Sequence, residues 1–353
     1  MFLHNRVNSE ELRKKIEADP TPRTTLSFYR YVILPEPAQL RDELYKAWHG
    51  LGVMGRIYLA HEGVNAQLSV PSDRVEEFRN WIDAFQPFSE VPFKIAIEDD
   101  GKSFFKLVIK VRKKIVADGL DDYAFDVTNV GKHLTAEEFN AAMDLPDTVV
   151  VDMRNHYESE VGRFEGAVCP DADTFKEELP QVVEFLKDRK EKKVLMYCTG
   201  GIRCEKASAY LRHHGFEDVN QLHGGIISYA REIKQKGLES KFKGKNFVFD
   251  DRLGERVTED IISVCHQCGI ACDTHTNCAN VDCNLLFIQC VACAEAFAAC
   301  CSETCKEITS LPEETQKTLR KGRQKPYSDM LFRKGRLRPA GNQLSTLTFK
   351  ARS

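Results

Sequence analysis

The sequence lacks any run of about 18 or more apolar residues, so we expect no helix that spans a membrane. Its first fifteen residues contain no apolar core of the kind that a secretory signal needs. We therefore expect a cytoplasmic protein, in a compartment that keeps thiols reduced. Also missing are a flavin or nicotinamide motif, an evident two-histidine, one-carboxylate set for iron, and an internal repeat. The sequence therefore indicates no standard redox cofactor.

Cysteine, in contrast, is abundant and unevenly placed. The chain of 353 residues has 13 cysteines, and ten of them lie between Cys265 and Cys305. A reducing compartment argues against a disulfide scaffold, so these ten form a local feature. Two Cys-x-x-Cys pairs of the kind found in zinc knuckles would complete one tetrahedral site. The pairs are Cys265 with Cys268 and Cys290 with Cys293, and a second site could come from Cys272, Cys278, Cys283, Cys300, Cys301 and Cys305.

The metal and its ligands stay partly open at this point. Spacing does not fix which thiolates share an ion, and His266 or His275 could replace one of them. An iron–sulfur cluster is the rival interpretation, although the spacing typical of ferredoxins is absent. We predict a structural zinc module over residues 245–305.

Charge is also uneven along the chain. Residues 306–353 contain 12 Lys or Arg and 4 Asp or Glu, whereas the whole chain has a formal net charge of −3. An acidic body with a basic tail favours a polyanion such as RNA as partner, and a solvated tail without a partner is the alternative. The tail residues predicted to bind RNA are Arg320, Lys321, Arg323, Arg333, Lys334 and Arg336.

Residues 1–120 mix strand-like and helix-like segments. The strand patterns lie at 24–34, 54–70 (with a turn inside), 93–100 and 104–116, and the amphipathic helix patterns at 37–51 and 72–85. This β-α-β-β-α-β order predicts a ferredoxin-like α+β domain, a compact sheet with helices on one face. The turn around Gly63, with His61, Glu62 and Asn65, is either an ordinary polar turn or a loop that faces substrate.

Residues 145–238 alternate buried strands with helices, which predicts a parallel α/β sheet with helices on both faces. In such sheets the active site lies at the carboxyl ends of the strands. Cys198 follows the apolar run "KKVLMY" and so lies at such an end. The whole chain is therefore predicted to be an α/β multidomain protein, with the basic tail after its zinc module.

The segment that follows this strand, "CTGGIR", can lower the pKa of a thiol. Gly200 and Gly201 let the backbone curl so that its N–H groups point inward, and the next helix adds its positive end. Arg203 closes the loop and either braces it against a carboxylate or faces an anion. These features favour a reactive thiolate at Cys198 over a buried structural cysteine.

Three further roles are predicted around this loop. Asp152, at the end of the preceding strand, is the candidate partner of Arg203 and completes the predicted catalytic set of Cys198, Arg203 and Asp152. The remaining loop residues are Thr199, Gly200, Gly201 and Ile202. Cys204 is either a resolving thiol or a helix residue without chemistry.

The loop is one residue shorter than the phosphate loop of cysteine phosphatases and resembles the rhodanese loop, which suits a persulfide on its cysteine. "VVVDMRNHYE", "VGRFEGAVCP" and "QLHGGIISY" are similar to rhodanese segments, although Phe164 and Glu165 replace the usual pair in the second. The resemblance implies a rhodanese domain over residues 145–238.

A wider resemblance covers the chain to about Cys305. "RTTLSFYRY", "GRIYLAHEGVNAQLSVP", "DDGKSFFKLVIKVRKKIVADG", "MYCTGGIRCEKAS" and "CHQCGIACDTHTNC" occur in this order in the bacterial tRNA uridine hydroxylases. This resemblance implies hydroxylation of the wobble uridine of tRNA to 5-hydroxyuridine, with molecular oxygen as co-substrate and Cys198 as the essential residue. It implies tRNA as partner, and we expect no obligate protein partner.

Two other functions stay open. A persulfide sulfurtransferase acting in tRNA thiolation would need the same nucleophile, and a non-catalytic RNA-binding or redox-sensing adaptor would need none. For hydroxylation, position 5 of uracil needs activation, and thiolate addition at position 6 would supply it by forming an enolate. The loop amides and Arg203 could stabilise the negative charge.

Overall fold

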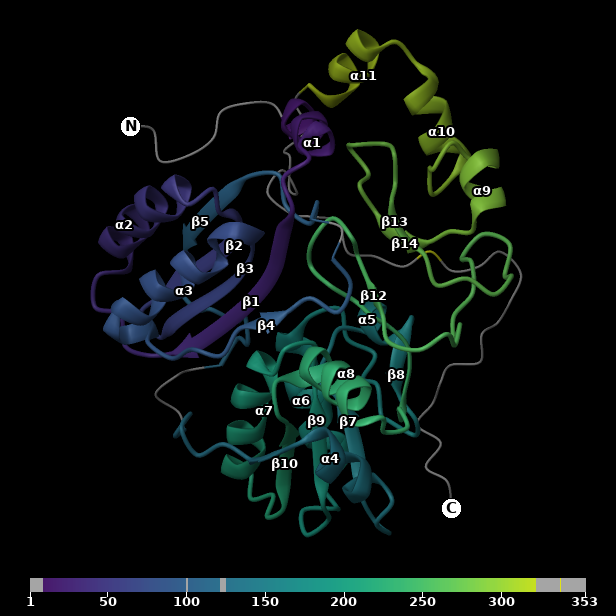
Figure 1. The fold of residues 1–353 in the computed structure, drawn as a ribbon. Helices are drawn as coiled ribbons and strands as arrows, with labels where there is room; N and C mark the ends of the chain where they lie inside the picture. Colours follow the sequence, from purple (N-terminus) through teal and green to yellow (C-terminus); the bar gives the residue numbers. More distant parts are fainter. Residues whose placement is uncertain (1–8, 100, 121–124, 322–336, 338–353) are drawn as a thin grey trace.

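The structure is a computed structural model of the chain, and it describes residues 9–99, 101–120, 125–321 and 337. The chain forms an N-terminal α+β part, a central parallel α/β part and a C-terminal part with short strands and helices (Figure 1). Among these residues no helix is long and apolar enough to cross a membrane.

The N-terminal part is the predicted ferredoxin-like domain. Its sheet has the order β4-β1-β3-β2-β5, in which the first four strands are antiparallel neighbours and β5 is added parallel to β2. Helices α2 (Pro37–Gly50) and α3 (Val75–Ala84) cover one face (Figure 1). Helix α1 (Ser9–Ala18) precedes this fold. The strands are β1 (Arg23–Tyr31), β2 (Met54–Ala60), β3 (Gly63–Pro71), β4 (Lys94–Ile95) and β5 (Leu107–Val111).

The two faces of this sheet differ in chemistry because side chains alternate along each strand. Toward the helices the strands present apolar residues such as Phe28, Ile57 and Leu68, which form one buried cluster with Trp48 of α2. The opposite face is polar. Two cross-strand rows form it, namely Ser27–Gln67–Arg56 and Tyr29–Asn65–Tyr58.

The central part is the predicted parallel sheet, with the strand order β6-β10-β9-β7. Val194 and Met196 of β9 pack toward α6 and α7, whereas Leu195 and Tyr197 pack toward α4 and α8. Helices therefore cover both faces, as predicted. The strands are β6 (Lys132–Leu134), β7 (Val149–Asp152), β9 (Val194–Tyr197) and β10 (Val219–Leu222). The helices are α4 (Ala136–Met143), α5 (His156–Ser159), α6 (Phe175–Leu186), α7 (Ile202–His213) and α8 (Gly225–Lys236).

The C-terminal part packs beside the parallel sheet through a second, three-stranded sheet of order β12-β11-β8. The cysteines follow, around a small two-stranded sheet. The strands here are β8 (Gly162–Phe164), β11 (Phe242–Asn246), β12 (Glu255–Arg256), β13 (His275–Asn277) and β14 (Leu286–Ile288). The helices are α9 (Val291–Ala296), α10 (Glu303–Ser310) and α11 (Glu313–Arg320).

The turn around Gly63 joins the first two parts rather than facing open solvent. Glu62 Oε2 lies 2.7 Å from Nζ of Lys206 on α7, and Lys206 also contacts Asp118 at 3.3 Å. Glu62 Oε1 accepts a hydrogen bond from the Ile115 amide. Because Lys206 is 2% exposed, this ion pair is a buried link between the two domains. With the domains joined in this way, the polar face of the N-terminal sheet lies opposite the loop that begins at Cys198.

Candidate active site

Cys198 lies where β9 ends and α7 is about to begin. Its Sγ accepts a hydrogen bond from the Gly201 amide at 3.1 Å, and the amides of Arg203 and Cys204 also point at it. Burial raises the pKa of Cys198, but the Cys204 thiol, the Arg203 charge and the two later amides outweigh burial and lower the pKa to about 6. A pKa of about 6 favours the thiolate at neutral pH, and the reactivity of Cys198 stays a prediction.

Cys204 thus has a physical effect on Cys198. It is fully buried, and burial and the hydrogen bond to Cys198 raise the pKa of Cys204 well above its usual value. Cys204 therefore keeps its proton and donates a hydrogen bond to the Cys198 thiolate.

Helix α8 holds the back of the loop. The amides of Ile226 and Ile227 donate hydrogen bonds to the carbonyls of Cys198 (3.0 Å) and Thr199 (3.2 Å). Gly225, at a φ of +67°, permits this approach, because a Cβ there would lie 2.5 Å from the Cys198 carbonyl oxygen. Because α8 binds the carbonyls of the loop on one side, the amides of the loop can point toward the sulfur of Cys198 on the other.

Arg203 is paired with Glu158, not with Asp152 as the sequence analysis expected. Its Nη1 and Nη2 donate to Glu158 Oε1 and Oε2 at 2.7 and 2.8 Å, and both side chains are buried. Thr199 joins this pair, since its hydroxyl lies 3.3 Å from both Arg203 Nη2 and Glu158 Oε2. Arg203 therefore braces the loop against α5.

Asp152 has a different partner, two residues along the chain. Arg154 donates from Nε and Nη2 to its two oxygens at 2.8 and 2.7 Å, and Tyr197 donates to Oδ2 at 2.7 Å. The hydrogen bond from Tyr197 ties β7 to β9, and both Asp152 oxygens already have partners other than Arg203. The sequence did mark Glu158 as a structured residue, because Asn155-x-x-Glu158 is a capping-box pattern and forms a capping box at the start of α5.

A second buried carboxyl lies in the surroundings of the loop. Glu178 of α6 is completely buried, and its oxygens make no hydrogen bond within the described part of the chain. Burial raises the pKa of Glu178 well above its usual value, and the nearby Arg203 charge only partly opposes this. Burial therefore favours the neutral, protonated form of Glu178 beside the Arg203–Glu158 pair.

A cavity of about 360 Å³ opens above the loop, between the loop and the polar face of the N-terminal sheet. Cys198, Thr199, Gly200, Ile202 and Arg203 form its floor. Its other walls include side chains of the N-terminal sheet and of the segment after β11, namely Tyr29, Arg56, Tyr58, Asn65, Gln67, Lys94, Phe249 and Arg252. The volume lies within the range of about 300–1,000 Å³ that is usual for small-ligand sites.

Sequence reasoning missed the N-terminal walls of this cavity, apart from Asn65, which it placed either in an ordinary polar turn or in a loop that faces substrate. The sequence did contain a sign of these walls. Strands β1, β2 and β3 alternate apolar and polar side chains, and the polar face carries tyrosines and amides, which are unusual on a sheet that only faces solvent. Lys94 gave no such signal, since β4 is only two residues long.

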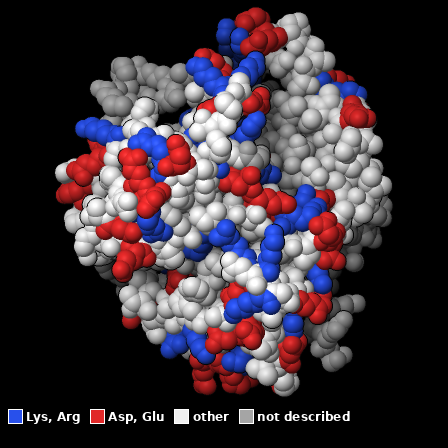
Figure 2. All heavy atoms as spheres, in the orientation of Figure 1, with Lys and Arg blue, Asp and Glu red and all other residues white. Residues whose placement is uncertain are grey.

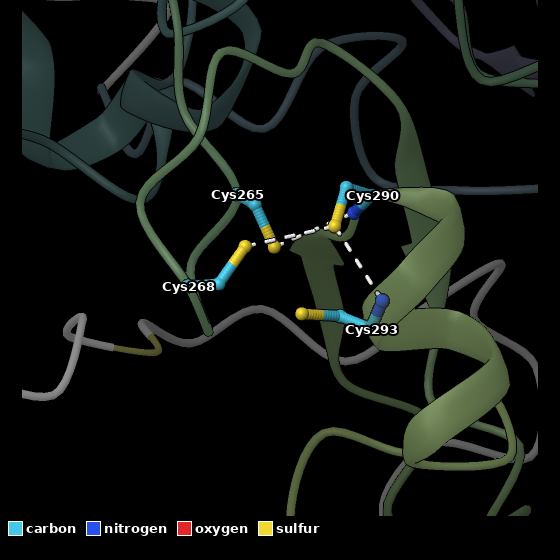
Figure 3. Close-up of side chains that lie close together, drawn as sticks. All are labelled: Cys265, Cys268, Cys290 and Cys293. Atoms are coloured by element: carbon cyan, nitrogen blue, oxygen red, sulfur yellow. Dashed lines mark hydrogen bonds between the residues drawn. The ribbon is translucent and has the colours of Figure 1, made fainter.

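Eight of the ten clustered cysteines form two groups of four (Figure 3 shows the first). Cys265, Cys268, Cys290 and Cys293 place their sulfurs within 4.8 Å of one another. Cys268 and Cys290 are 3.6 Å apart, too far for a disulfide and near the about 3.8 Å expected around a tetrahedral zinc ion. This group could hold a metal ion.

The second group is Cys278, Cys283, Cys301 and Cys305, with sulfur distances of 3.6 Å (Cys283 to Cys301) and 3.7 Å (Cys301 to Cys305). Cys272 and Cys300 lie outside both groups, although the sequence analysis included them among the ligands. Cys300 lies 3.4 Å from the Thr309 hydroxyl, and Cys272 is buried in the apolar cluster beside the first group.

Of the tail residues predicted to bind RNA, the structure describes only Arg320, at the end of α11, and Lys321. Arg323, Arg333, Lys334 and Arg336 lie outside the described residues. On the face drawn in Figure 2, Lys and Arg side chains are interspersed with Asp and Glu across the described parts of the molecule.

The family models that match this chain follow its three parts. Family models match residues 23–115 (UPF0176 acylphosphatase like domain), 135–232 (rhodanese-like domain) and 243–306 (rhodanese C-terminal). The chain is 59% identical over 342 residues to the tRNA uridine(34) hydroxylase of Leptospira interrogans, covering 97% of this chain and 93% of that one. It is 56% identical to that of Cronobacter sakazakii, covering 95% of each. Among solved structures, a rhodanese-like domain from Anabaena matches with a TM-score of 0.26 and 21% identity, covering 32% of this chain and 78% of that one.

Proposed function

Because the chain belongs to the tRNA uridine(34) hydroxylases, we propose that it hydroxylates the wobble uridine of tRNA to 5-hydroxyuridine. The observation that carries the proposal is the placement of Cys198, a low-pKa thiol at the floor of a cavity of small-ligand size. One base, turned out of the anticodon loop, is the ligand that we assign to this cavity.

The first chemical step follows from the thiolate. Cys198 Sγ forms a bond to C6 of the uracil, and the electron pair of the C5–C6 double bond moves toward C4 and leaves negative charge on O4. The resulting enolate makes C5 nucleophilic. Arg203 positions the loop for this step through its pair with Glu158, and its charge favours the thiolate before attack.

We propose molecular oxygen as the oxidant. One oxygen atom becomes the hydroxyl at C5, and the other leaves as water after accepting two electrons and two protons from a reductant outside the chain. Departure of the C5 proton and of the Cys198 thiolate then restores the C5–C6 double bond. Hydroxylation under ¹⁸O₂ should therefore place one labelled atom in the nucleoside, whereas label from H₂¹⁸O would contradict this part of the proposal.

We also propose that each cysteine group holds a structural zinc ion. Four thiolate ligands with sulfurs spaced for a tetrahedron suit zinc, and a closed set of protein ligands is typical of structural sites. In the first group the pKa of Cys265 falls to about 6, because amide and thiol hydrogen bonds outweigh burial, so a thiolate ligand is available there. The zinc ions would fix the C-terminal segment that begins the basic tail.

A sulfurtransferase remains the second candidate, because four residues between Cys198 and Arg203 make a ring that suits a persulfide. Mass spectrometry of tRNA nucleosides from a deletion strain separates the two. Loss of 5-hydroxyuridine and its derivatives supports hydroxylation, and loss of 2-thiouridine supports sulfur transfer. Complementation with Cys198→Ser, a folded protein without the thiolate, should fail to restore 5-hydroxyuridine.

A further inference from the structure

Lys94 reaches the active-site loop from the other domain. It lies on the edge strand β4, opposite Ser27 of β1, and is only 7% exposed. Its stem passes over the glycines of the loop and of α8. A Cβ on Gly200 would lie 3.7 Å from Lys94 Cδ, and one on Gly224 would lie 3.8 Å from Cε. Lys94 and Cys198 therefore line the same cavity from opposite sides.

The ammonium of Lys94 has a cation–π partner instead of a carboxylate. Its Nζ lies 4.3 Å from the centre of the Tyr29 ring, and the Tyr29 hydroxyl donates to Glu205 at 3.1 Å. No carboxylate in the described ranges forms an ion pair with Lys94. Of the other cations in the cavity wall, Arg203 is paired with Glu158 and Arg252 with Asp250, whereas Arg56 donates to the Phe249 carbonyl at 3.1 Å.

We propose that Lys94 is a catalytic residue, which donates a hydrogen bond to the carbonyl oxygen that gains negative charge when Cys198 adds to the target base. This inference rests on the proposed function. As the sulfur–C6 bond forms, the displaced electron pair ends on O4, and the Lys94 ammonium neutralises it without an added co-reactant. A preorganised cation in a dry site acts most strongly on charge that develops in the transition state.

The electrostatics of the cavity agree with this role. Burial lowers the pKa of Lys94 to about 8, although the charges of Cys198 and Glu205 oppose the shift. Lys94 therefore keeps most of its charge at pH 7, while Cys198 is ionised. The groups that face Lys94 are Tyr29 from β1, Cys198 from the loop and Glu205 from α7.

The addition step can be tested without oxygen or a reductant. An anticodon stem-loop with 5-fluorouridine at the wobble position has an electrophilic C6, and thiolate addition gives a covalent complex that a denaturing gel resolves. We expect wild-type protein to form this complex and Cys198→Ser to form none. Lys94→Met, which keeps the length of the stem, should form it about 100-fold more slowly, the usual cost of losing one such donor.

Three controls make the result specific to Lys94. Lys46→Met removes an exposed lysine of α2 and should leave the rate unchanged. Stem-loop affinity of Lys94→Met should stay within about twofold, since phosphate contacts dominate binding. The rate of Cys198 alkylation by iodoacetamide, measured for each variant, reports any change in the pKa of the thiol, and the rate of complex formation is corrected for that change. Lys94→Arg, which keeps the cation, should recover part of the rate. Lys94→Gln, which is polar but uncharged, should be slowed like Lys94→Met and covers the case in which the methionine variant does not fold.

The outcomes separate the two proposals. If wild type forms the complex and both the corrected Lys94→Met and Lys94→Gln rates equal it, the role of Lys94 is wrong and the proposed function stands. If wild type hydroxylates tRNA yet forms no complex, addition at C6 is wrong and the role of Lys94 is wrong with it. If wild type neither forms the complex nor hydroxylates tRNA, the proposed function itself is wrong.

Discussion

Glu158→Gln tests how much of the active site depends on one buried ion pair. The substitution keeps the shape of the side chain but removes its charge, so Arg203 loses a bidentate partner at 2.7 and 2.8 Å and stays buried. Breaking a buried pair in this way typically costs about 3–5 kcal/mol, because a buried charge is left uncompensated. The amide oxygen of the glutamine can still accept a hydrogen bond from Arg203, so we expect the free energy of unfolding to fall by an amount near the lower end of that range.

The assay must report on the parallel sheet. Both tryptophans, Trp48 and Trp81, lie in the N-terminal domain, so tryptophan fluorescence would follow the wrong unit. Native-state hydrogen exchange of the β7 and β9 amides measures the free energy of opening where the pair acts. Glu184→Gln is the matched control, since its pair with Lys187 is exposed and screened by water, so we expect little change in stability.

The same variant should also change the thiol. Without Glu158, the Arg203 charge acts on Cys198 unopposed, so the pKa of Cys198 should fall below about 6, as read from iodoacetamide alkylation against pH. A variant as stable as Glu184→Gln, with an unchanged alkylation profile, would refute the view that this pair holds and tunes the loop.

The remaining predictions concern activity, metal and binding. Arg203→Lys should lose most of its hydroxylation activity because lysine cannot donate in parallel to both carboxylate oxygens; turnover equal to wild type would contradict the brace. The rate should rise with pH through about 6 as Cys198 ionises and fall through about 8 as Lys94 loses its proton, and Lys94→Met should lose the alkaline fall. Elemental analysis of protein purified without chelator should find about two zinc ions per chain, and iron or no metal would be the contrary result. Truncation after Cys305 should weaken tRNA binding and flatten its salt dependence while sparing zinc, and an unchanged slope would point to the N-terminal domain as the RNA platform.

Local patterns predicted the parts of this molecule that local forces determine. The order of strands and helices, the position of Cys198 at a strand end and the Cys-x-x-Cys pairs are all readable within a short window of sequence. The partner of Arg203 was not readable in that way. Asp152 and Glu158 are both acidic and close in sequence, so either could be the partner of Arg203. Glu158 is the partner because Asp152 is already paired with Arg154. Side-chain competition of this kind needs coordinates.

The cavity itself was beyond sequence reasoning because two domains build it. Nothing in β4 marks Lys94 as a cavity residue until the N-terminal sheet is docked on α7 through Glu62 and Lys206. The division of the cysteines was hidden for a similar reason. Which eight of ten meet depends on how β13, β14 and α9 fold back on one another.

The N-terminal sheet, which forms a wall of the cavity above Cys198, also affects how easily this thiol is oxidised. A low-pKa thiolate is ordinarily the first group that disulfides and oxidants attack in a cell. Cys198 is fully buried at the floor of a cavity of about 360 Å³, which is small beside a disulfide of two tripeptides. We therefore expect glutathione disulfide to react with this sulfur more slowly than a peroxide does. The N-terminal domain lets the enzyme keep a thiolate permanently ready while exposing it to few reaction partners.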